Sequence, residues 1–217
     1  MPTGSSKTLV IAVVAFVIAA GLGYWGYAAL KKREGQKSVV AAVTDVSARL
    51  REALTIEAGP QAASKLDEHA AAADRALQEI KRLDASANRA LVDAADNYLL
   101  TAREILKRQS DRHRHGLALA DSLQALRQHM RADNRTGTWV QEAVKARERV
   151  NKDYRGYGVA AEVLGKLLES LPATQKSIAP LVGGAPMIPD DLIANAGKRV
   201  RQEAQLAAAE VERLKLR

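Results

Sequence analysis

Residues 9–30 read LVIAVVAFVIAAGLGYWGYAAL, a run of apolar and small residues without a single charge. At a rise of ~1.5 Å per residue, a helix of this length spans the ~30 Å hydrocarbon core of a bilayer. Aromatic side chains mark its C-terminal end and a basic cluster follows it, as expected where a helix meets lipid headgroups. The predicted membrane-interface anchors are Tyr24, Trp25, Tyr27, Lys31, Lys32 and Arg33. The chain therefore begins with a short polar tail (residues 1–8), a single predicted transmembrane helix (9–30) and a basic juxtamembrane segment (31–37).

A cleavable signal peptide is the alternative interpretation of this stretch. Its apolar core would end at Leu22, with a small-residue cleavage site near Ala19 or Ala20. The apolar run continues well past that site and only Lys7 precedes it, which favours a retained helix. Cleavage would instead leave a soluble protein outside the cytoplasm.

The orientation of the span depends on its flanking charges. Lys31, Lys32, Arg33 and Lys37 follow the span, whereas Lys7 alone precedes it. Because cytoplasmic flanks carry more Lys and Arg, this slightly favours a cytoplasmic C-terminal domain. The periplasmic side is the alternative, since many bacterial single-span anchors export that domain. The predicted location is the bacterial inner membrane, crossed once.

Small residues at Ala15, Ala19 and Gly23 recur at four-residue spacing on one face of the predicted span. Such residues let two helices approach closely in lipid, so they form a candidate dimer face. Alanine and glycine are also common throughout this span, and chance spacing is the competing explanation.

The composition of the remaining chain favours helices. Alanine supplies much of the 47% hydrophobic content, and aromatics make up only 4%. Alanine, leucine and the long charged side chains lose little conformational freedom in a helix. The absence of cysteine excludes disulfides and thiolate chemistry. Half of the net charge of +8 lies within residues 1–33, so the high charge is weak evidence for nucleic-acid binding.

Turn signals divide residues 38–217 into expected helices. Gly59-Pro60 ends a helix over 37–58 and begins a long second helix over 60–110. The next breaks are a turn or kink at DRHRHG (111–116) and a turn at DNRTG (133–137), with Thr138 as a possible cap for the following helix.

The later helices follow from the same signals. A third helix carries Leu119 to Met130, and a fourth, bent at Gly156 and Gly158, ends near Pro172. A last helix runs from Leu192 to the C-terminus. Apolar residues recur at helical spacing in each segment, with alanine at many seam positions. The predicted fold class is all-α: an elongated antiparallel helical bundle with coiled-coil-like packing after the transmembrane helix.

The loop PLVGGAPMIP (180–189) is apolar and punctuated by Gly and Pro. Two interpretations fit its side chains: they cover the end of the bundle, or they dock into a partner. The candidate docking residues are Leu181, Val182, Met187 and Ile188.

Motifs for catalysis or cofactor binding are absent from the sequence. It contains no phosphate-binding loop, no H-E-x-x-H and no G-x-S-x-G, so we expect no enzyme, no cofactor and no metal site. His113 and His115 fit a basic turn better than a metal site, because Arg112 and Arg114 flank them. The densest basic patch is Arg103, Lys107, Arg108, Arg112 and Arg114. Interspersed acids and missing stacking aromatics make it a solvated face rather than a nucleic-acid site.

The favoured function is a single-pass, membrane-anchored scaffold or adaptor whose helices bind a protein partner or another copy of the chain. An extracytoplasmic sensory or ligand-binding bundle is the alternative; the chemistry of its ligand is not indicated. An enzyme whose groups converge from separate helices is the third possibility.

Overall fold

The computed structural model describes residues 33–57, 59, 61–83, 88–132, 137–185 and 187–215. Within these ranges the chain forms five helices and no strand, which confirms the predicted all-α helical bundle. Residues 33–53 form what we call the first helix. The helices that follow it are α2 (Ala62–Arg82), α3 (Arg89–Arg131), α4 (Trp139–Ile178) and α5 (Asp190–Lys215).

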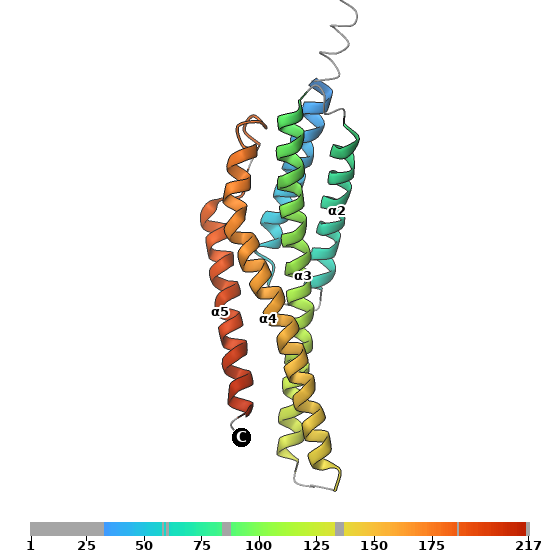
Figure 1. Ribbon diagram of the computed structural model, residues 1–217, viewed down its shortest axis with the longest axis vertical. Helices are drawn as coiled ribbons and strands as arrows, with labels where there is room; N and C mark the ends of the chain where they lie inside the picture. The colour runs from blue at the N-terminus through green and yellow to red at the C-terminus, as the bar shows by residue number, and fades with distance from the viewer. Residues whose placement is uncertain are drawn as a thin grey trace, which may run out of the picture.

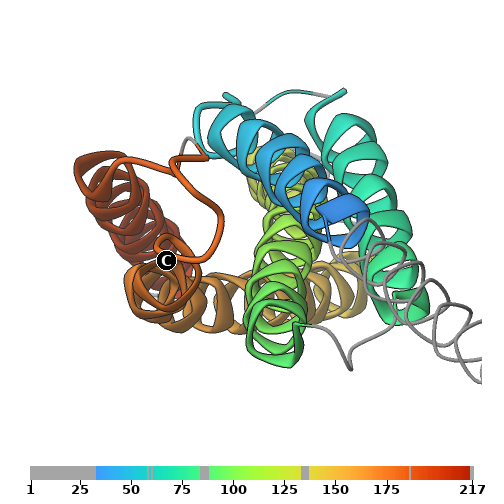
Figure 2. The same cartoon turned by 90° about the horizontal axis from the view of Figure 1, so that it is seen from above.

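Successive helices run in opposite directions, so the bundle is an up-and-down rod (Figure 1). The 43 residues of α3 make it the longest helix, about 65 Å at ~1.5 Å per residue. The hairpin of α3 and α4 extends beyond the ends of the first helix and α2, and its tip lies opposite the end that holds residue 33 (Figure 1). Seen from above, α4 crosses α3 obliquely and reaches α5 at its other end (Figure 2).

Two apolar cores lie in series along this rod. The proximal core, on the side of residue 33, draws on all five helices through side chains such as Leu50, Leu66, Leu99, Leu164 and Ile193. The distal core lies between α3, α4 and α5 only. Its buried residues are Leu119, Leu123, Leu126, Val150, Tyr157 and Val211. Burial of this apolar surface is the main favourable term that holds the helices together.

The predicted single helix over 60–110 is wrong, because the chain breaks between α2 and α3. Leu83 is extended, with φ −70° and ψ 143°, and a new helix begins after Asn88. Asp84, Ser86 and Asn88 follow in the sequence, and Asp, Ser and Asn are less favourable in a helix interior than Ala or Leu. A shift in the phase of the apolar stripe at Leu83 marks this break in the sequence.

Of the turn and the kink predicted as alternatives at 111–116, the turn is wrong, because α3 continues through these residues as one helix. Gly116 lies inside the helix, where a Cβ would meet the Tyr157 ring at 3.5 Å. Gly156 on α4 meets His115 even more closely, since a Cβ there would lie 2.7 Å from the imidazole Nδ1. The two glycines therefore let α3 and α4 pack closely where they meet.

The fourth helix is continuous from Trp139 to Ile178 with Pro172 inside it, so its predicted end near Pro172 is wrong. Buried residues lie on both sides of the proline: Leu171 precedes it, and Gln175 and Ile178 follow it. Their packing keeps the last turns of α4 helical. The predicted break between the third and fourth helices is confirmed, because α3 ends at Arg131 and α4 begins at Trp139; residues 133–136 of the predicted turn lie outside the described residues. The last helix begins at Asp190, two residues earlier than expected, with acidic Asp190 and Asp191 in its first turn.

Among the residues that the structure describes, no helix combines the length and apolarity that crossing a bilayer requires.

Candidate functional site

The predicted membrane elements lie almost entirely outside the described residues. This holds for the span over 9–30, for its candidate dimer face, and for all of its interface anchors except Arg33. Arg33 is exposed at the start of the first helix. The residues that lie outside are Ala15, Ala19, Gly23, Tyr24, Trp25, Tyr27, Lys31 and Lys32.

The loop over 180–189 folds onto the bundle itself. Val182 and Ile188 are buried in the proximal core, and Leu181 and Met187 pack against it. The amide of Gln175 fixes the loop at Ile188, donating to its carbonyl O at 3.0 Å and accepting its N–H at 2.8 Å. A partner reaches Val182 and Ile188 only by displacing them from this core, whereas Leu181 and Met187 are partly exposed; docking through the loop stays a prediction.

The predicted basic patch is largely ion-paired, and three of its five residues pair with acids on α2. Arg103 and Lys107 both meet Asp74, the second at 3.4 Å, and Arg114 pairs with Asp67. These acids on α2 neutralise much of the positive charge that the sequence concentrates on α3.

Polar side chains interrupt the core where the proximal core ends and the distal core begins. Gln109, Arg112 and His113 are buried on α3 at this level. Arg112 forms an ion pair with Glu203 on α5, and its Nη2 lies 3.5 Å from the Nε2 of His113. Its Nε is buried without a hydrogen-bond partner among the described residues.

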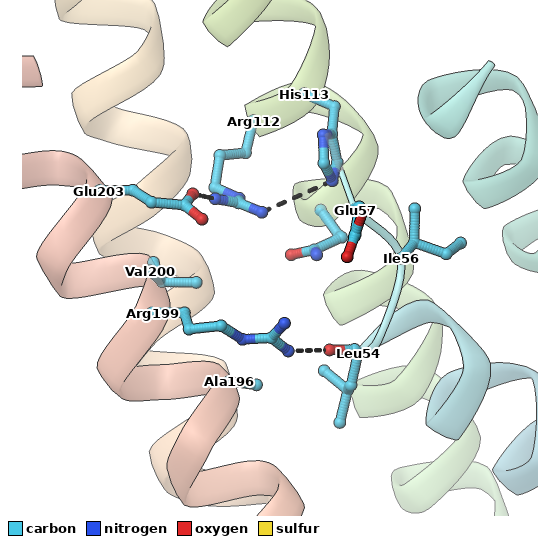
Figure 3. Close-up of a pocket in the computed structure, with 10 residues that line it drawn as sticks. Leu54, Ile56, Glu57, Arg112, His113, Ala196, Arg199, Val200 and Glu203 are labelled. Atoms are coloured by element: carbon cyan, nitrogen blue, oxygen red, sulfur yellow. Dashed lines mark hydrogen bonds and ion pairs between the residues drawn. The ribbon is translucent and has the colours of Figure 1, made fainter. Parts of the chain in front are cut away.

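A cavity of about 150 Å³ opens beside this polar layer, between the end of the first helix, α3 and α5 (Figure 3). Leu54, Ile56, Ala196 and Val200 supply its apolar wall. Arg199 reaches across it from α5 and donates a hydrogen bond to the carbonyl O of Leu54. The polar lining consists of Glu57, Gln109, Arg112, His113, Arg199 and Glu203.

The electrostatics of the layer keep His113 neutral. Its pKa is lowered from 6.5 to about 4, mainly by burial and also by the nearby positive charge of Arg112, while the carboxylate of Glu203 opposes the shift. Burial also raises the pKa of the Tyr157 phenol on α4, partly offset by Arg112. At neutral pH the layer therefore contains one ion pair among neutral groups.

Sequence reasoning missed this layer because it assigned residues 111–116 to a solvated turn. A signal was present: the α3 seam continues at helical spacing from Leu106 through Gln109, His113 and Gly116 to Leu119. The partner Glu203, 91 residues from Arg112, has no comparable signal.

A second ordered feature lies at the tip of the α3–α4 hairpin. The rings of His129 and Trp139 stack with centroids 5.1 Å apart and planes 16° apart. Trp139 Nε1 donates to the carbonyl O of His129 at 3.3 Å, and His129 Nε2 lies 3.0 Å from the carbonyl O of Trp139. Next to this clamp, Val140 and Val144 are 63% and 51% exposed. Being four residues apart, they share one helix face, which we call the tip surface.

Within the described part of the chain, no three metal-binding side chains of His, Asp or Glu converge to hold an ion. No protein-family model matches the chain, and no curated protein or solved structure matches it.

Proposed function

We propose that this protein is a single-pass, membrane-anchored helical scaffold or adaptor that mediates protein–protein interaction without catalysis. In this proposal the segment 9–30 crosses the inner membrane, and the bundle holds a binding surface away from the bilayer. A cytoplasmic bundle is slightly favoured by the flanking charges, with the periplasm as the alternative.

The single observation that carries the proposal is the exposed apolar tip surface at the far end of the rod. Isolated exposed apolar side chains are ordinary, but two adjacent valines on a braced helix end form a preorganised contact. The His129–Trp139 clamp fixes the backbone on which Val140 stands. A partner would therefore meet a surface that needs little ordering on binding.

The reach of the rod also supports the proposal. The first helix and α3 begin at the same end, and α3 alone accounts for about 65 Å between that end and the tip (Figure 1). An elongated bundle of this kind is suited to presenting a contact at a fixed height above its anchor.

Photo-crosslinking tests the binding role. A crosslinking amino acid is placed at Val144 in the full-length protein in its native membrane, with Val159, which is 62% exposed on the same helix, as the matched control. We expect discrete adducts from position 144 that a second substitution, Val140→Asp, removes, and none from position 159. Equal adducts from both positions, or none, would reject the tip surface as a binding site.

Reporter fusions test the anchoring. Alkaline phosphatase and green fluorescent protein are each fused after Arg217 and compared in intact bacteria. Fluorescence with inactive phosphatase would place the bundle in the cytoplasm, and the reverse would place it in the periplasm. Recovery of either fusion in the soluble fraction, with the N-terminal segment cleaved, would contradict the anchor.

A further inference from the structure

Charges around the cavity between the first helix, α3 and α5 do not all pair with one another. Arg112 and Glu203 neutralise each other, and His113 is neutral at pH 7. Arg199 is held only by the neutral carbonyl of Leu54, and Glu57 forms no ion pair with a described residue. One positive and one negative charge therefore line the cavity without compensation.

Gln109 adds an unused polar group to the same wall. The residue is 5% exposed, its amide makes no hydrogen bond to a described residue, and its amide atoms are not fully shielded at the cavity. Buried amides are normally hydrogen-bonded, because leaving one unpaired costs free energy. An amide that lines a cavity without a protein partner is available to a bound molecule with a complementary polar group.

Size and polarity narrow the class of that molecule. An engineered protein cavity of comparable volume holds benzene, which has about six non-hydrogen atoms. The apolar wall of Leu54, Ile56, Ala196 and Val200 requires an apolar part in the ligand. The carboxylate of Glu57 in the same lining disfavours a simple anion, because like charges repel.

We propose that this cavity binds a small α-amino acid such as alanine. The ligand carboxylate contacts Arg199 and the Gln109 amide, its ammonium group contacts Glu57, and its side chain lies against the apolar wall. Arg199 and Glu57 are both exposed, so they lie at the mouth of the cavity, where a ligand can enter. This binding site is independent of the proposed partner contact at the tip surface.

Ligand-observed NMR titration of the full-length protein in detergent tests the assignment. The probes are L-alanine, propionate, which lacks the ammonium, and L-alaninamide, which lacks the carboxylate. We expect saturable binding of L-alanine with a Kd between about 10 μM and 1 mM. Each singly charged analogue should bind about tenfold more weakly or worse, because it leaves one charge unpaired.

Two variants and two controls locate the site. Arg199→Gln and Glu57→Gln should each weaken L-alanine binding by about tenfold. The control Arg201→Gln removes a charge two residues away on α5 that pairs with Glu169, and Glu68→Gln removes an exposed acid on α2. Both controls should bind like the parent protein. All four positions are exposed, and circular dichroism confirms that each variant is folded.

Three results would overturn the proposal. If propionate bound as tightly as L-alanine, the ammonium group would contribute nothing, and the cavity would be an anion site only. Unchanged affinity in Arg199→Gln would place the ligand elsewhere. No saturation by L-alanine up to about 10 mM would leave only solvent in the cavity.

Discussion

Arg112 on α3 meets Glu203 on α5 at the level where the two cores join, so one ion pair links these helices between two apolar regions. The two partners differ in exposure: 7% of the Arg112 side chain is accessible to solvent, against 49% for Glu203. The arginine therefore depends on the glutamate more than the reverse, because an uncompensated charge is costlier when it is buried.

Substituting Glu203→Gln should lower the free energy of unfolding by about 1–2 kcal/mol, less than for a fully buried pair because the carboxylate is half-exposed. Chemical denaturation followed by circular dichroism measures the loss. The control is Glu210→Gln, which removes the pair with Arg127; because the Arg127 side chain is 42% exposed, against 7% for Arg112, the loss should be at most about 0.5 kcal/mol. Equal losses of unfolding free energy in Glu203→Gln and Glu210→Gln would show that the burial of Arg112 does not make its ion pair more important.

Acid should destabilise the protein partly through His113. The unfolded chain takes up this proton near pH 6.5, whereas the native pKa is about 4, chiefly because the imidazole is buried. Between these values the unfolded state binds more protons, so stability falls as the pH decreases from about 6.5 to about 4. Over this pH range, the free energy of unfolding of His113→Gln should fall by roughly 2 kcal/mol less than that of the parent protein.

Urea denaturation at a series of pH values checks this expectation. The pKa of His69 is also lowered, mainly by burial, and it contributes in the same direction in both proteins. The difference between parent and variant isolates His113. Parallel pH profiles for the two proteins would show that His113 does not titrate as described.

Ser47 and Tyr98 are fully buried, and their hydroxyl oxygens lie 2.6 Å apart between the first helix and α3. Tyr98→Phe should cost about 1–2 kcal/mol because it leaves the Ser47 hydroxyl without a partner. The double variant with Ser47→Ala should lose less than the sum of the single losses, with a coupling of about 1 kcal/mol. Strict additivity would mean that the two hydroxyls are stabilised independently.

At position 175, glutamine should stabilise the protein more than other residues of similar volume, because its amide both donates to and accepts from the Ile188 backbone. Gln175→Met keeps the volume and loses both hydrogen bonds, at a cost of about 2–3 kcal/mol. Gln175→Glu retains an acceptor for the Ile188 N–H but loses the donor. Thermal unfolding should therefore rank the parent above both variants, and a Met variant as stable as the parent would exclude a role for the bonds.

Helical spacing and composition were sufficient to predict the class of the fold but not all of its boundaries. The turn at 133–137 was recognisable because Asp, Asn and Gly cluster there with no competing apolar spacing. Residues 111–116 carry similar turn-like residues, yet packing of Arg112 and His113 against α4 and α5 keeps them helical. The intrinsic preference of a residue for a helix or a turn is worth a fraction of a kcal/mol. Tertiary packing contributes more, so it decides the conformation here.

The cavity was beyond sequence reasoning for a different reason. It requires the end of the first helix, the middle of α3 and the middle of α5 to meet, and no spacing rule links Leu54, Gln109 and Arg199. The tip clamp is closer in sequence, since His129 and Trp139 are ten residues apart. Even so, ring stacking across a turn depends on where the two helices end.

The serial arrangement of the two cores has an evolutionary consequence. The proximal core contains every described contact of the first helix and α2 with the rest of the apolar interior, whereas the distal core depends on three helices alone. Removing one matched heptad from the distal parts of α3, α4 and α5 would bring the tip nearer to residue 33 by about 10 Å without changing the register of the proximal core. In evolution, the length of the distal part can therefore change while the part of the bundle around the first helix stays the same.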